Sequence, residues 1–556
     1  MDTVSPRRWW ALGALSLSVL VVALDLFVLT LALPTVSTDL HASSGDLQWF
    51  VDAYSLVLAA ALLPAGLLGD QVGRKRLLTG ALVLFGISSL ACAYSTSAGE
   101  LIAARAVLGL AAAVILPMSL AVLPVLFTAE ERPRAIAAVG GATFLGYPIG
   151  PILGGWLLDH FWWGSVFLIN IPVVVIAVAA VAVLMPESRG EGRQRVDATG
   201  IVVSSAGLTS LTYGLIKAGD AGWTDLAAVI TMAAGAVVLA GFVGWERWVS
   251  RSRAAGPRDD GHARRRPQPL VDLGLFGSAG FTWGTVLSTL VSFALFGLVF
   301  AMPQYFLDVR GFDSLGAGLR MLPMIGGLAI GLIAGQRLQT PRKRARSRDR
   351  AAGPPVGQKA VVAAGFAIMA AALAVGTGTT AASTTGFAAA WFAVTGLGLG
   401  VAMPTALNAA LGALSPARSG SGAALITAMR QVGGTIGVAV LGTVLATVYR
   451  SKLQLSGVPA AAEHAIRASV AGGVATARAT GSQALLEGVR VAYVHGLDVM
   501  LWACSGIAIV SALLALAFLP NRAESAGEGG SAGPGNPAGA AVAAATSQPG
   551  ESRMSP

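Results

Sequence analysis

The chain has 556 residues, of which 54% are hydrophobic and only 12% are charged, and its mean hydropathy is +0.70. Soluble proteins carry about 25% charged residues, so this composition excludes an ordinary soluble domain and favours a protein whose surface mostly faces lipid. The net charge of +10 does not indicate nucleic-acid binding, because the Lys and Arg residues lie mostly in short segments between apolar runs.

Cysteine and histidine usage argues against a disulfide framework and against a metal site. The two cysteines, Cys92 and Cys504, both fall inside apolar runs, and the five histidines form no cluster with ligand spacing. The sequence also lacks the Gly-x-x-x-x-Gly-Lys-Ser/Thr pattern of an ATP-binding loop. We therefore expect no metal and no cofactor.

The dominant pattern is a series of long apolar runs. A helix that crosses a bilayer needs about 20 predominantly apolar residues. By this measure the sequence predicts an all-α membrane protein with fourteen transmembrane helices, at about 11–33, 50–69, 77–95, 101–126, 136–158, 163–184, 198–217, 225–246, 278–303, 315–335, 359–377, 386–412, 421–448 and 495–519.

Positive charge alternates along the segments between these runs. Lys and Arg residues cluster before the first run and after the even-numbered runs, whereas the other segments hold mostly Asp and Glu. The exception is the long segment 449–494, which holds five Lys and Arg residues, and long segments escape the charge rule. Because segments rich in Lys and Arg stay in the cytoplasm, this alternation predicts an even number of spans with both termini cytoplasmic. By the same parity, the long segment 449–494 lies outside, and its Ala-rich part at 459–490 is a candidate helical hairpin.

A charged, glycine-spaced segment at 66–76, Gly-Leu-Leu-Gly-Asp-Gln-Val-Gly-Arg-Lys-Arg, joins the second and third runs. Its first and last glycines permit tight turns, its Asp can cap a neighbouring helix or pair with an Arg, and its basic residues can bind anionic headgroups. The residues with these predicted roles are Gly66, Asp70, Gly73, Arg74, Lys75 and Arg76.

This spacing resembles the cytoplasmic loop signature of the major facilitator superfamily of secondary transporters. The resemblance implies that the loop gates transport by latching the two halves of the protein together when the outside is open. The alternative is an ordinary basic loop without a gating role.

The same resemblance implies two six-helix bundles with a substrate cavity between them. Fourteen runs fit this plan if the seventh and eighth form an inserted helix pair. The expected parts are a cytoplasmic N-terminus at 1–10, an N-terminal bundle at 11–190, the inserted pair at 198–246, a cytoplasmic linker at 247–277, a C-terminal bundle at 278–519 that includes the outer loop 449–494, and a disordered cytoplasmic tail at 520–556. A second copy of the loop signature, after the tenth run, lacks the Asp and is followed by a basic insert at 341–350.

The fifth run contains a periodic pattern of small residues. Glycines four residues apart form one smooth helix face, and a proline among them removes a backbone hydrogen bond. The pattern resembles the antiporter motif of drug and antibiotic exporters, and the alternative is an ordinary contact between two helices. The residues concerned are Gly146, Gly150, Pro151, Gly154 and Gly155.

An acidic residue, Asp25, lies in the middle of the first apolar run. A charged carboxylate at that depth costs about 2.5–3.5 kcal/mol on insertion scales, so it should face a cavity or a partner. The run from Ala23 to Pro34 resembles the first-span signature of the fourteen-helix drug:proton antiporter family, although Phe27 and Thr30 stand where a Thr and an Asn are usual. The resemblance implies that Asp25 loads and releases a proton, and the alternative is a carboxylate with a structural role.

Two further charged residues carry the same resemblance. Arg105, near the start of the fourth run, matches a position that is linked to proton transfer in the family; alternatively, its side chain snorkels to the membrane surface. Asp52 lies in the segment Trp49–Tyr54 that opens the second run and is similar to the matching segment of quaternary-ammonium exporters. The resemblance implies a part for Asp52 in proton coupling, and the alternative is an exposed helix cap.

The thirteenth run also matches the fourteen-helix family. Quaternary-ammonium exporters carry extra carboxylates in spans ten and thirteen, whereas this chain has Leu328, Thr427 and Gln431 near those positions. Dications that need several carboxylates are therefore disfavoured as substrates. The residues of the matching motif are Arg430, Gln431, Gly433 and Gly434.

The resemblance covers about residues 10–520 and implies a proton-coupled antiporter of a bacterial plasma membrane that exports amphipathic drug-like or antibiotic compounds. The alternative is a dedicated exporter of one endogenous metabolite, such as a self-made antibiotic or a lipid precursor. A membrane enzyme or sensor is disfavoured, because no loop is long enough to supply a soluble catalytic domain. The expected partners are a small-molecule substrate, protons and lipid, with no nucleic acid, and we expect the monomer to be functional.

Overall fold

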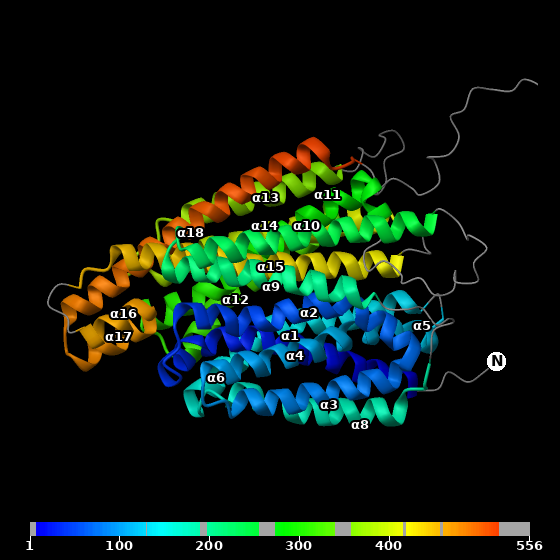
Figure 1. The fold of residues 1–556 in the computed structure, drawn as a ribbon, viewed down its shortest axis with the longest axis horizontal. Helices are drawn as coiled ribbons and strands as arrows, with labels where there is room; N and C mark the ends of the chain where they lie inside the picture. The colour runs from blue at the N-terminus through cyan, green and yellow to red at the C-terminus, as the bar shows by residue number, and fades with distance from the viewer. Residues whose placement is uncertain are drawn as a thin grey trace, which may run out of the picture.

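The computed structural model describes residues 7–128, 131–188, 197–254, 273–339, 357–414, 419–455 and 460–521. Within these ranges most residues lie in helices and none lies in a β-strand. The long helices run roughly along one axis of the molecule (Figure 1). This arrangement confirms the all-α fold that the apolar runs predict.

The first half of the chain forms one group of packed helices. Several of its helices begin at residues whose side chains cap the helix: Ser43 and Ser97 each accept a hydrogen bond from a backbone amide of the first turn. The helices are α1 (Arg7–Asp39), α2 (Ser44–Val72), α3 (Arg74–Ala93), α4 (Ala98–Ala121), α5 (Leu123–Leu126), α6 (Arg132–His160), α7 (Ser165–Leu168) and α8 (Asn170–Leu184).

The second half of the chain forms another group of packed helices. Its helices are a short 3-10 helix η2 (Leu273–Gly277), α11 (Ala279–Gln304), a π-helical turn η3 (Tyr305–Val309), α12 (Ser314–Gln339), α13 (Gln358–Gly376), α14 (Thr385–Gly412), α15 (Ser419–Lys452), α16 (Ala460–Ala468), α17 (Val470–Ala479) and α18 (Gln483–Phe518).

Buried apolar side chains separate into two main clusters that follow this division. One is built almost entirely from α1 to α8, and the other from α11 to α18. The clusters interlock at a few positions, because Phe300 of α11 belongs to the first and Leu31 of α1 belongs to the second. Each half therefore has its own core, and the halves meet along a narrower contact.

Between the halves in sequence lie two further helices, α9 (Ala198–Ala221) and α10 (Leu226–Ala254). They pack against each other, and α9 also packs against α2 and α15. The hydroxyl of Thr443 in α15 donates to the carbonyl oxygen of Leu215 in α9 at 3.0 Å. The helix pair thus contacts both halves through α9, while most of α10 is exposed on the surface.

In the part of the chain that the structure describes, twelve helical segments are long and apolar enough to cross a membrane. The predicted spans at 50–69 and 136–158 correspond to α2 and α6, which have 29 residues each and do not belong to those twelve. The all-helical membrane fold is confirmed, and the count of fourteen spans stays a prediction.

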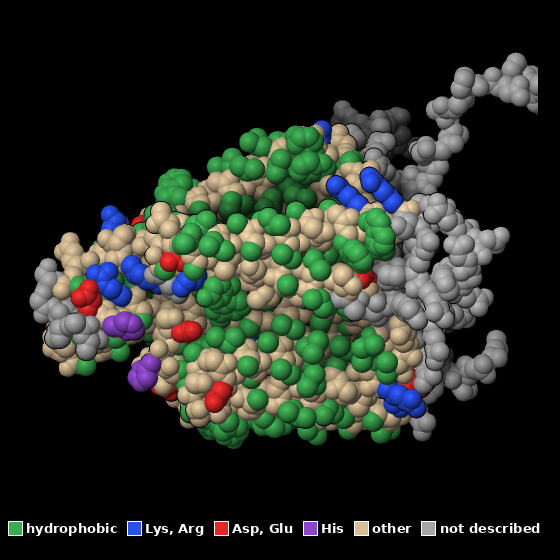
Figure 2. Space-filling view, viewed as in Figure 1, with side chains coloured by type: hydrophobic (Ala, Val, Ile, Leu, Met, Phe, Trp, Pro, Cys, Tyr) green, Lys and Arg blue, Asp and Glu red, His purple; other side chains and the backbone are tan. Residues whose placement is uncertain are grey.

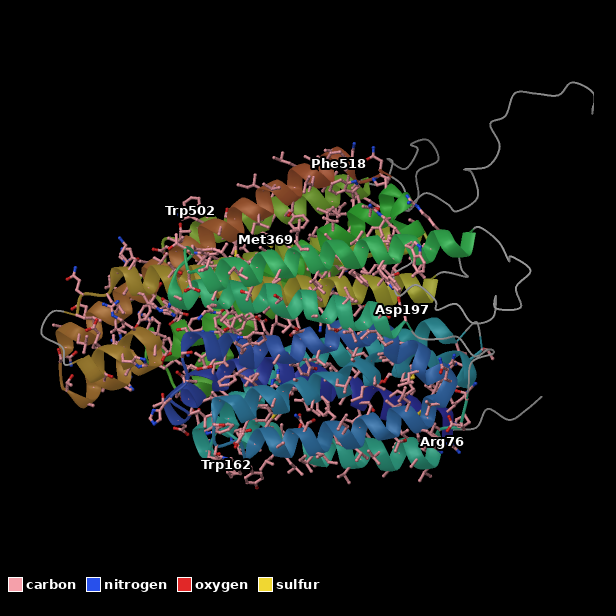
Figure 3. The ribbon with its side chains drawn as sticks, in the orientation of Figure 1. Arg76, Trp162, Asp197, Met369, Trp502 and Phe518 are labelled. Atoms are coloured by element: carbon pink, nitrogen blue, oxygen red, sulfur yellow. The ribbon has the colours of Figure 1, made fainter. Side chains whose placement is uncertain are left out.

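The two ends of the molecule differ. Following the topology predicted from the sequence, we call the end that carries α16 and α17 the outer end, and the end at which α1 begins and α18 finishes the inner end (Figure 1). Apolar side chains are spread over the middle of the visible face, and the Lys, Arg and His side chains lie near the two ends (Figure 2). Arg76 and Asp197 lie toward the inner end, and Trp162 and Trp502 lie toward the outer end (Figure 3). This distribution is typical of a protein that spans a bilayer.

Several segment boundaries differ from the prediction. The segment 449–494 is mostly helical: α15 continues to Lys452, α16 and α17 follow, and α18 begins at Gln483 rather than near residue 495. The predicted linker at 247–277 is partly helix, since α10 continues to Ala254. The rest of that linker up to residue 272, the basic insert and the tail beyond residue 521 lie outside the described residues.

Candidate transport site

The centre of the site is an ion pair between two transmembrane helices of the first half. The Nη1 atom of Arg105 in α4 donates to the Oδ2 atom of Asp25 in α1, and their side chains are 0% and 1% exposed. The snorkelling alternative for Arg105 is therefore wrong, because the guanidinium lies inside the bundle. Removing one member of such a pair leaves an uncompensated buried charge, which typically costs about 3–5 kcal/mol.

Helix α2 holds the Arg105 guanidinium in place. The Nε atom of Arg105 donates to the carbonyl oxygen of Phe50 at 2.9 Å, and its guanidinium carbon lies 4.4 Å from the centre of the Tyr54 ring. A side chain at Gly109 would collide with the Tyr54 carbonyl, so this glycine permits the close approach of α4 to α2. Arg105 thus has partners on α2 that do not depend on the charge of Asp25.

A second polar side chain binds the other carboxylate oxygen. The Nδ2 atom of Asn170, the first residue of α8, donates to the Oδ1 atom of Asp25 at 3.2 Å and to the Oγ atom of Ser89 in α3 at 3.1 Å. Asn170 was not among the residues predicted from the sequence. A lone amide inside the apolar run at 163–184 was the available signal, since an unpaired amide in a membrane is costly.

Asp52 does not take part in the cluster formed by Asp25, Arg105 and Asn170. It is 0% exposed, and neither of its carboxylate oxygens has a hydrogen-bond partner among the described residues. The exposed-cap alternative is wrong, because α2 is capped by Ser43. Phe50 and Tyr54 face α4, so Asp52 points away from the ion pair. Its neighbour one turn earlier, Gln48, contacts Gly442 of α15.

The glycines of the antiporter motif bring α6 close to two other helices. Gly146 and Gly154 face α1, where an added Cβ would lie 2.7 Å from Ala23 and 3.1 Å from Val28. Gly155 faces α12 of the other half, where an added Cβ would lie 2.6 Å from the Ser314 carbonyl oxygen.

The remaining two residues of the motif are buried on the same helix. Gly150 and Pro151 both lie inside α6. The Pro151 carbonyl lies so close to Gly318 of α12 that a side chain at Gly318 would collide with it. The motif therefore packs α6 on α1 and also on α12.

Hydrogen bonds at the outer end join the two halves. The Asp159 carboxylate, at the end of α6, accepts from the backbone amides of Ser314 and Leu315 at 2.9 Å each. The Ser37 hydroxyl of α1 lies 3.0 Å from the hydroxyl of Ser469, which caps α17. The Ser44 hydroxyl donates to the Ala468 carbonyl oxygen at 2.6 Å. In this conformation the outer ends of the halves are in contact.

The predicted gating loop is almost entirely helical, contrary to the expected pair of turns. Gly66 lies inside α2, and only Gly73, with a φ of +115°, stands between α2 and α3. The positive φ explains why glycine occupies this position. The side chain of Asp70 lies outside the described residues.

The basic residues of this loop contact other segments of the same half. Arg74 donates to the Ala121 carbonyl at 2.9 Å and Lys75 to the Ala182 carbonyl at 2.7 Å. Arg76 forms an ion pair of 3.5 Å with Glu187. Arg74 and Lys75 thus satisfy carbonyl oxygens near the ends of α4 and α8, a structural role that was not predicted from the sequence.

The motif of the thirteenth run packs α15 on α11. An added Cβ at Gly433 would lie 2.5 Å from the Thr289 side chain, and one at Gly434 would lie 3.0 Å from the Phe296 ring. Arg430 donates from Nε to the Ser292 hydroxyl at 3.2 Å. Gln431 is half-buried one residue further on. The motif lies in the second half and does not contact the ion pair.

Comparison with known proteins decides the family. The model of the Major Facilitator Superfamily matches residues 15–438. The chain belongs to the Major Facilitator Superfamily. It is therefore a multi-pass membrane transporter, as the helical architecture and the apolar surface also indicate.

Relatives of the chain are named as export, efflux or resistance proteins. It is 30% identical over 523 residues to the tetracenomycin C resistance and export protein of Streptomyces glaucescens, covering 92% of this chain and 91% of the relative. It is 32% identical over 517 residues to the multidrug efflux pump LfrA of Mycolicibacterium smegmatis, covering 92% and 95%. It is 32% identical over 524 residues to the methyl viologen resistance protein SmvA of Salmonella typhimurium, covering 91% and 97%.

Solved structures of the superfamily share the fold. A bacterial homologue of the human lysosomal transporter Spinster, crystallised in an inward-facing, unoccupied conformation, has a TM-score of 0.61 at 15% identity and covers 92% of this chain and 98% of that one. A D-xylose–proton symporter has a TM-score of 0.55 at 14% identity, with coverage of 92% and 98%.

Proposed function

We propose that the chain is a proton-coupled antiporter that exports amphipathic drug-like or antibiotic compounds across a bacterial plasma membrane, with both termini in the cytoplasm. Three relatives of about 30% identity over nearly the whole chain are drug or antibiotic resistance and export proteins, which supports the substrate class. The observation that carries the coupling mechanism is the buried pair of Asp25 and Arg105.

In this mechanism Asp25 exchanges a proton for the ion pair with Arg105. When the carboxylate binds a proton, it loses most of its attraction to the guanidinium. Arg105 keeps its contacts with the Phe50 carbonyl and the Tyr54 ring, and these contacts still stabilise its positive charge when Asp25 is neutral. Proton binding therefore weakens the attachment of α1 to α4. A transporter whose two halves move against each other needs such a change to couple proton binding to that movement.

The proton gradient supplies the energy in this proposal, and the transporter needs no cofactor. Each positive charge that moves inward across the membrane contributes about 2.3 kcal/mol per 100 mV. The contacts at the outer end, such as Asp159 with Ser314, close the outer side. A proton from outside reaches Asp25 only after these contacts separate, so proton entry is tied to the outward-open state.

The test is dye efflux in everted vesicles that contain the wild-type chain or the Asp25→Asn variant. We expect an uncoupler to abolish wild-type efflux, and we expect Asp25→Asn, compared at an equal amount of inserted protein, to lose proton-driven efflux. Undiminished, uncoupler-sensitive efflux by Asp25→Asn would exclude this role of Asp25.

The breadth of substrates is a separate question. A dedicated exporter of one metabolite is the second candidate, and the relative named for tetracenomycin C resistance and export favours it. A panel of structurally unrelated dyes and antibiotics separates the two candidates. Transport of several unrelated compounds supports the multidrug pump, and transport of a single class supports the dedicated exporter.

A further inference from the structure

The amide of Asn170 is placed between the carboxylate of Asp25 and a fixed anchor. Asn170 is 1% exposed, and its Nδ2 atom donates both to Asp25 Oδ1 at 3.2 Å and to Ser89 Oγ at 3.1 Å. Its Oδ1 atom is buried and has no hydrogen-bond partner among the described residues. The site therefore holds an unused acceptor on the side chain that already binds the carboxylate.

This combination fits both protonation states of a carboxyl group. An ionised carboxylate only accepts hydrogen bonds, whereas a neutral carboxylic acid also has a hydroxyl that must donate. An amide offers a donor and an acceptor, and rotation by 180° about its last bond exchanges them. Arg105, the other residue that binds Asp25, has donors only and cannot accept from the acid.

We propose that Asn170 is a positioning residue for proton exchange, which donates to Asp25 when the carboxyl is charged and accepts from it when the carboxyl is neutral. This inference rests on the proposed function, in which Asp25 carries the proton. Because a buried polar group without a partner is costly, a partner that serves both states keeps the exchange reversible. Ser89 holds the amide within reach of Asp25 from α3.

The charged and titratable groups near Asp25 come from three helices. Arg105 of α4 pairs with it directly, and the Tyr54 hydroxyl of α2 and the Cys92 thiol of α3 interact with it electrostatically. From α6, Gly146 packs against Ala23 and Gly154 against Val28, and neither glycine can carry a charge. Asn170 itself is uncharged, so its replacement leaves the number of charges in the site unchanged.

The experiment compares pH profiles of purified, reconstituted protein. The key variant is Asn170→Leu, which keeps the number and branching of the side-chain heavy atoms and removes both the donor and the acceptor. Asn170→Gln, which restores an amide, is the conservative variant. Asn408→Leu is the matched control, because Asn408 is exposed on α14 of the other half. The first readout is proton-driven dye efflux from pH 5 to 9, with the substrate KM measured separately.

The second readout does not depend on transport. A hydrophobic carbodiimide modifies protonated carboxyl groups, so the pH dependence of its reaction with Asp25, with Asp25→Asn as the blank, reports the proton on that residue directly. Asn170→Leu removes the donor from the charged carboxylate and also the acceptor from the neutral acid. Because a hydrogen bond to a charged group is worth more than one between neutral groups, the charged form loses more and the proton should bind more tightly. We expect both profiles to move upward by about one pH unit, which is a tenfold change in proton affinity.

The outcomes separate the two proposals. An upward shift of both profiles in Asn170→Leu, reversed in Asn170→Gln and absent in Asn408→Leu, supports the inference. Profiles that superimpose on the wild type, even with a lower yield of folded protein, overturn it and leave Asn170 a structural residue. If the carbodiimide profile shifts but Asp25→Asn transports normally, the amide sets the protonation of Asp25 and the proposed coupling role of Asp25 fails.

Discussion

The hydroxyl oxygens of Ser37 and Ser469 lie 3.0 Å apart, although 432 positions separate the two residues in the sequence. Ser37 is in the last part of α1, and Ser469 caps α17 of the outer hairpin formed by α16 and α17. The Tyr449 hydroxyl of α15 donates to the Ile466 carbonyl oxygen at 2.8 Å, which ties the same hairpin to the second half. The outer hairpin is thus bound to both halves in this conformation.

A disulfide between these positions should trap the transporter. With Ser37→Cys and Ser469→Cys combined, the two sulfurs are within reach of a bond, and the native Cys92 and Cys504 are buried and separate. We expect oxidation to abolish efflux and a reducing agent to restore it, because the outer ends must part for release. The measurement is dye efflux before and after reduction, with each single variant as the control. Full efflux by the crosslinked protein would show that the outer hairpin does not have to leave α1.

Removing the charge at Asp159 should favour opening of the outer side. The carboxylate accepts two backbone hydrogen bonds from the start of α12, one on each oxygen. An asparagine has a single side-chain oxygen, so one of the two bonds is lost, which is worth about 1 kcal/mol, or about fivefold in an equilibrium. We expect Asp159→Asn to raise the labelling rate of Ser37→Cys by an impermeant thiol reagent about fivefold. Asp225→Asn is the matched control, because Asp225 caps α10 at Ala228 without joining the two halves. Equal rates in both variants would contradict a latch at Asp159.

A small side chain at Gly155 should hinder closure of the outer end. A Cβ there would lie 2.6 Å from both the Ser314 carbonyl oxygen and the Leu315 Cα, which are backbone atoms that cannot turn aside. Overpacking of this kind costs about 1–3 kcal/mol, so we expect Gly155→Ala to reduce efflux roughly tenfold. Gly140→Ala and Gly141→Ala on the same helix are the controls, since nothing lies within 4 Å of their added Cβ atoms. A loss of efflux in all three variants would point to α6 itself rather than to its contact with α12.

Replacement of Gly73 should destabilise the fold without changing the coupling. Its φ of +115° disfavours any side chain, and an added Cβ would lie 2.6 Å from the Glu187 carboxylate. We expect Gly73→Ala to lower the free energy of unfolding by about 1–3 kcal/mol, measured as a lower melting temperature in detergent. The pH profile of efflux by the remaining folded protein should match that of the wild type. Gly80→Ala on α3, with open space around it, should melt like the wild type.

The helices, the membrane fold and the identity of several site residues follow from local sequence. Apolar runs of about 20 residues form helices because a bilayer offers no other partner for backbone amides and carbonyls. The same physics predicts that Asp25 needs a partner, since an isolated charge in the membrane is costly. The boundaries of 66–76 and 449–494 were predicted poorly, because polar and glycine-rich segments can continue a helix when neighbouring helices satisfy their groups.

The pairing of residues was decided by packing alone. Arg105 and Asn170 lie 80 and 145 positions from Asp25, and no spacing in the sequence shows that α4 and α8 place them on its two carboxylate oxygens. Asp52 was predicted to share in proton coupling with Asp25, yet its carboxylate is buried without a hydrogen-bond partner among the described residues and points away from the pair. The sequence by itself determined that the chain is a bundle of membrane helices with a costly charge inside. The length of each apolar run and the presence of a charged residue within it can be read from neighbouring residues alone. Only the tertiary structure decided which groups stabilise that charge, because hydrogen bonds form between atoms that the fold brings within about 3 Å.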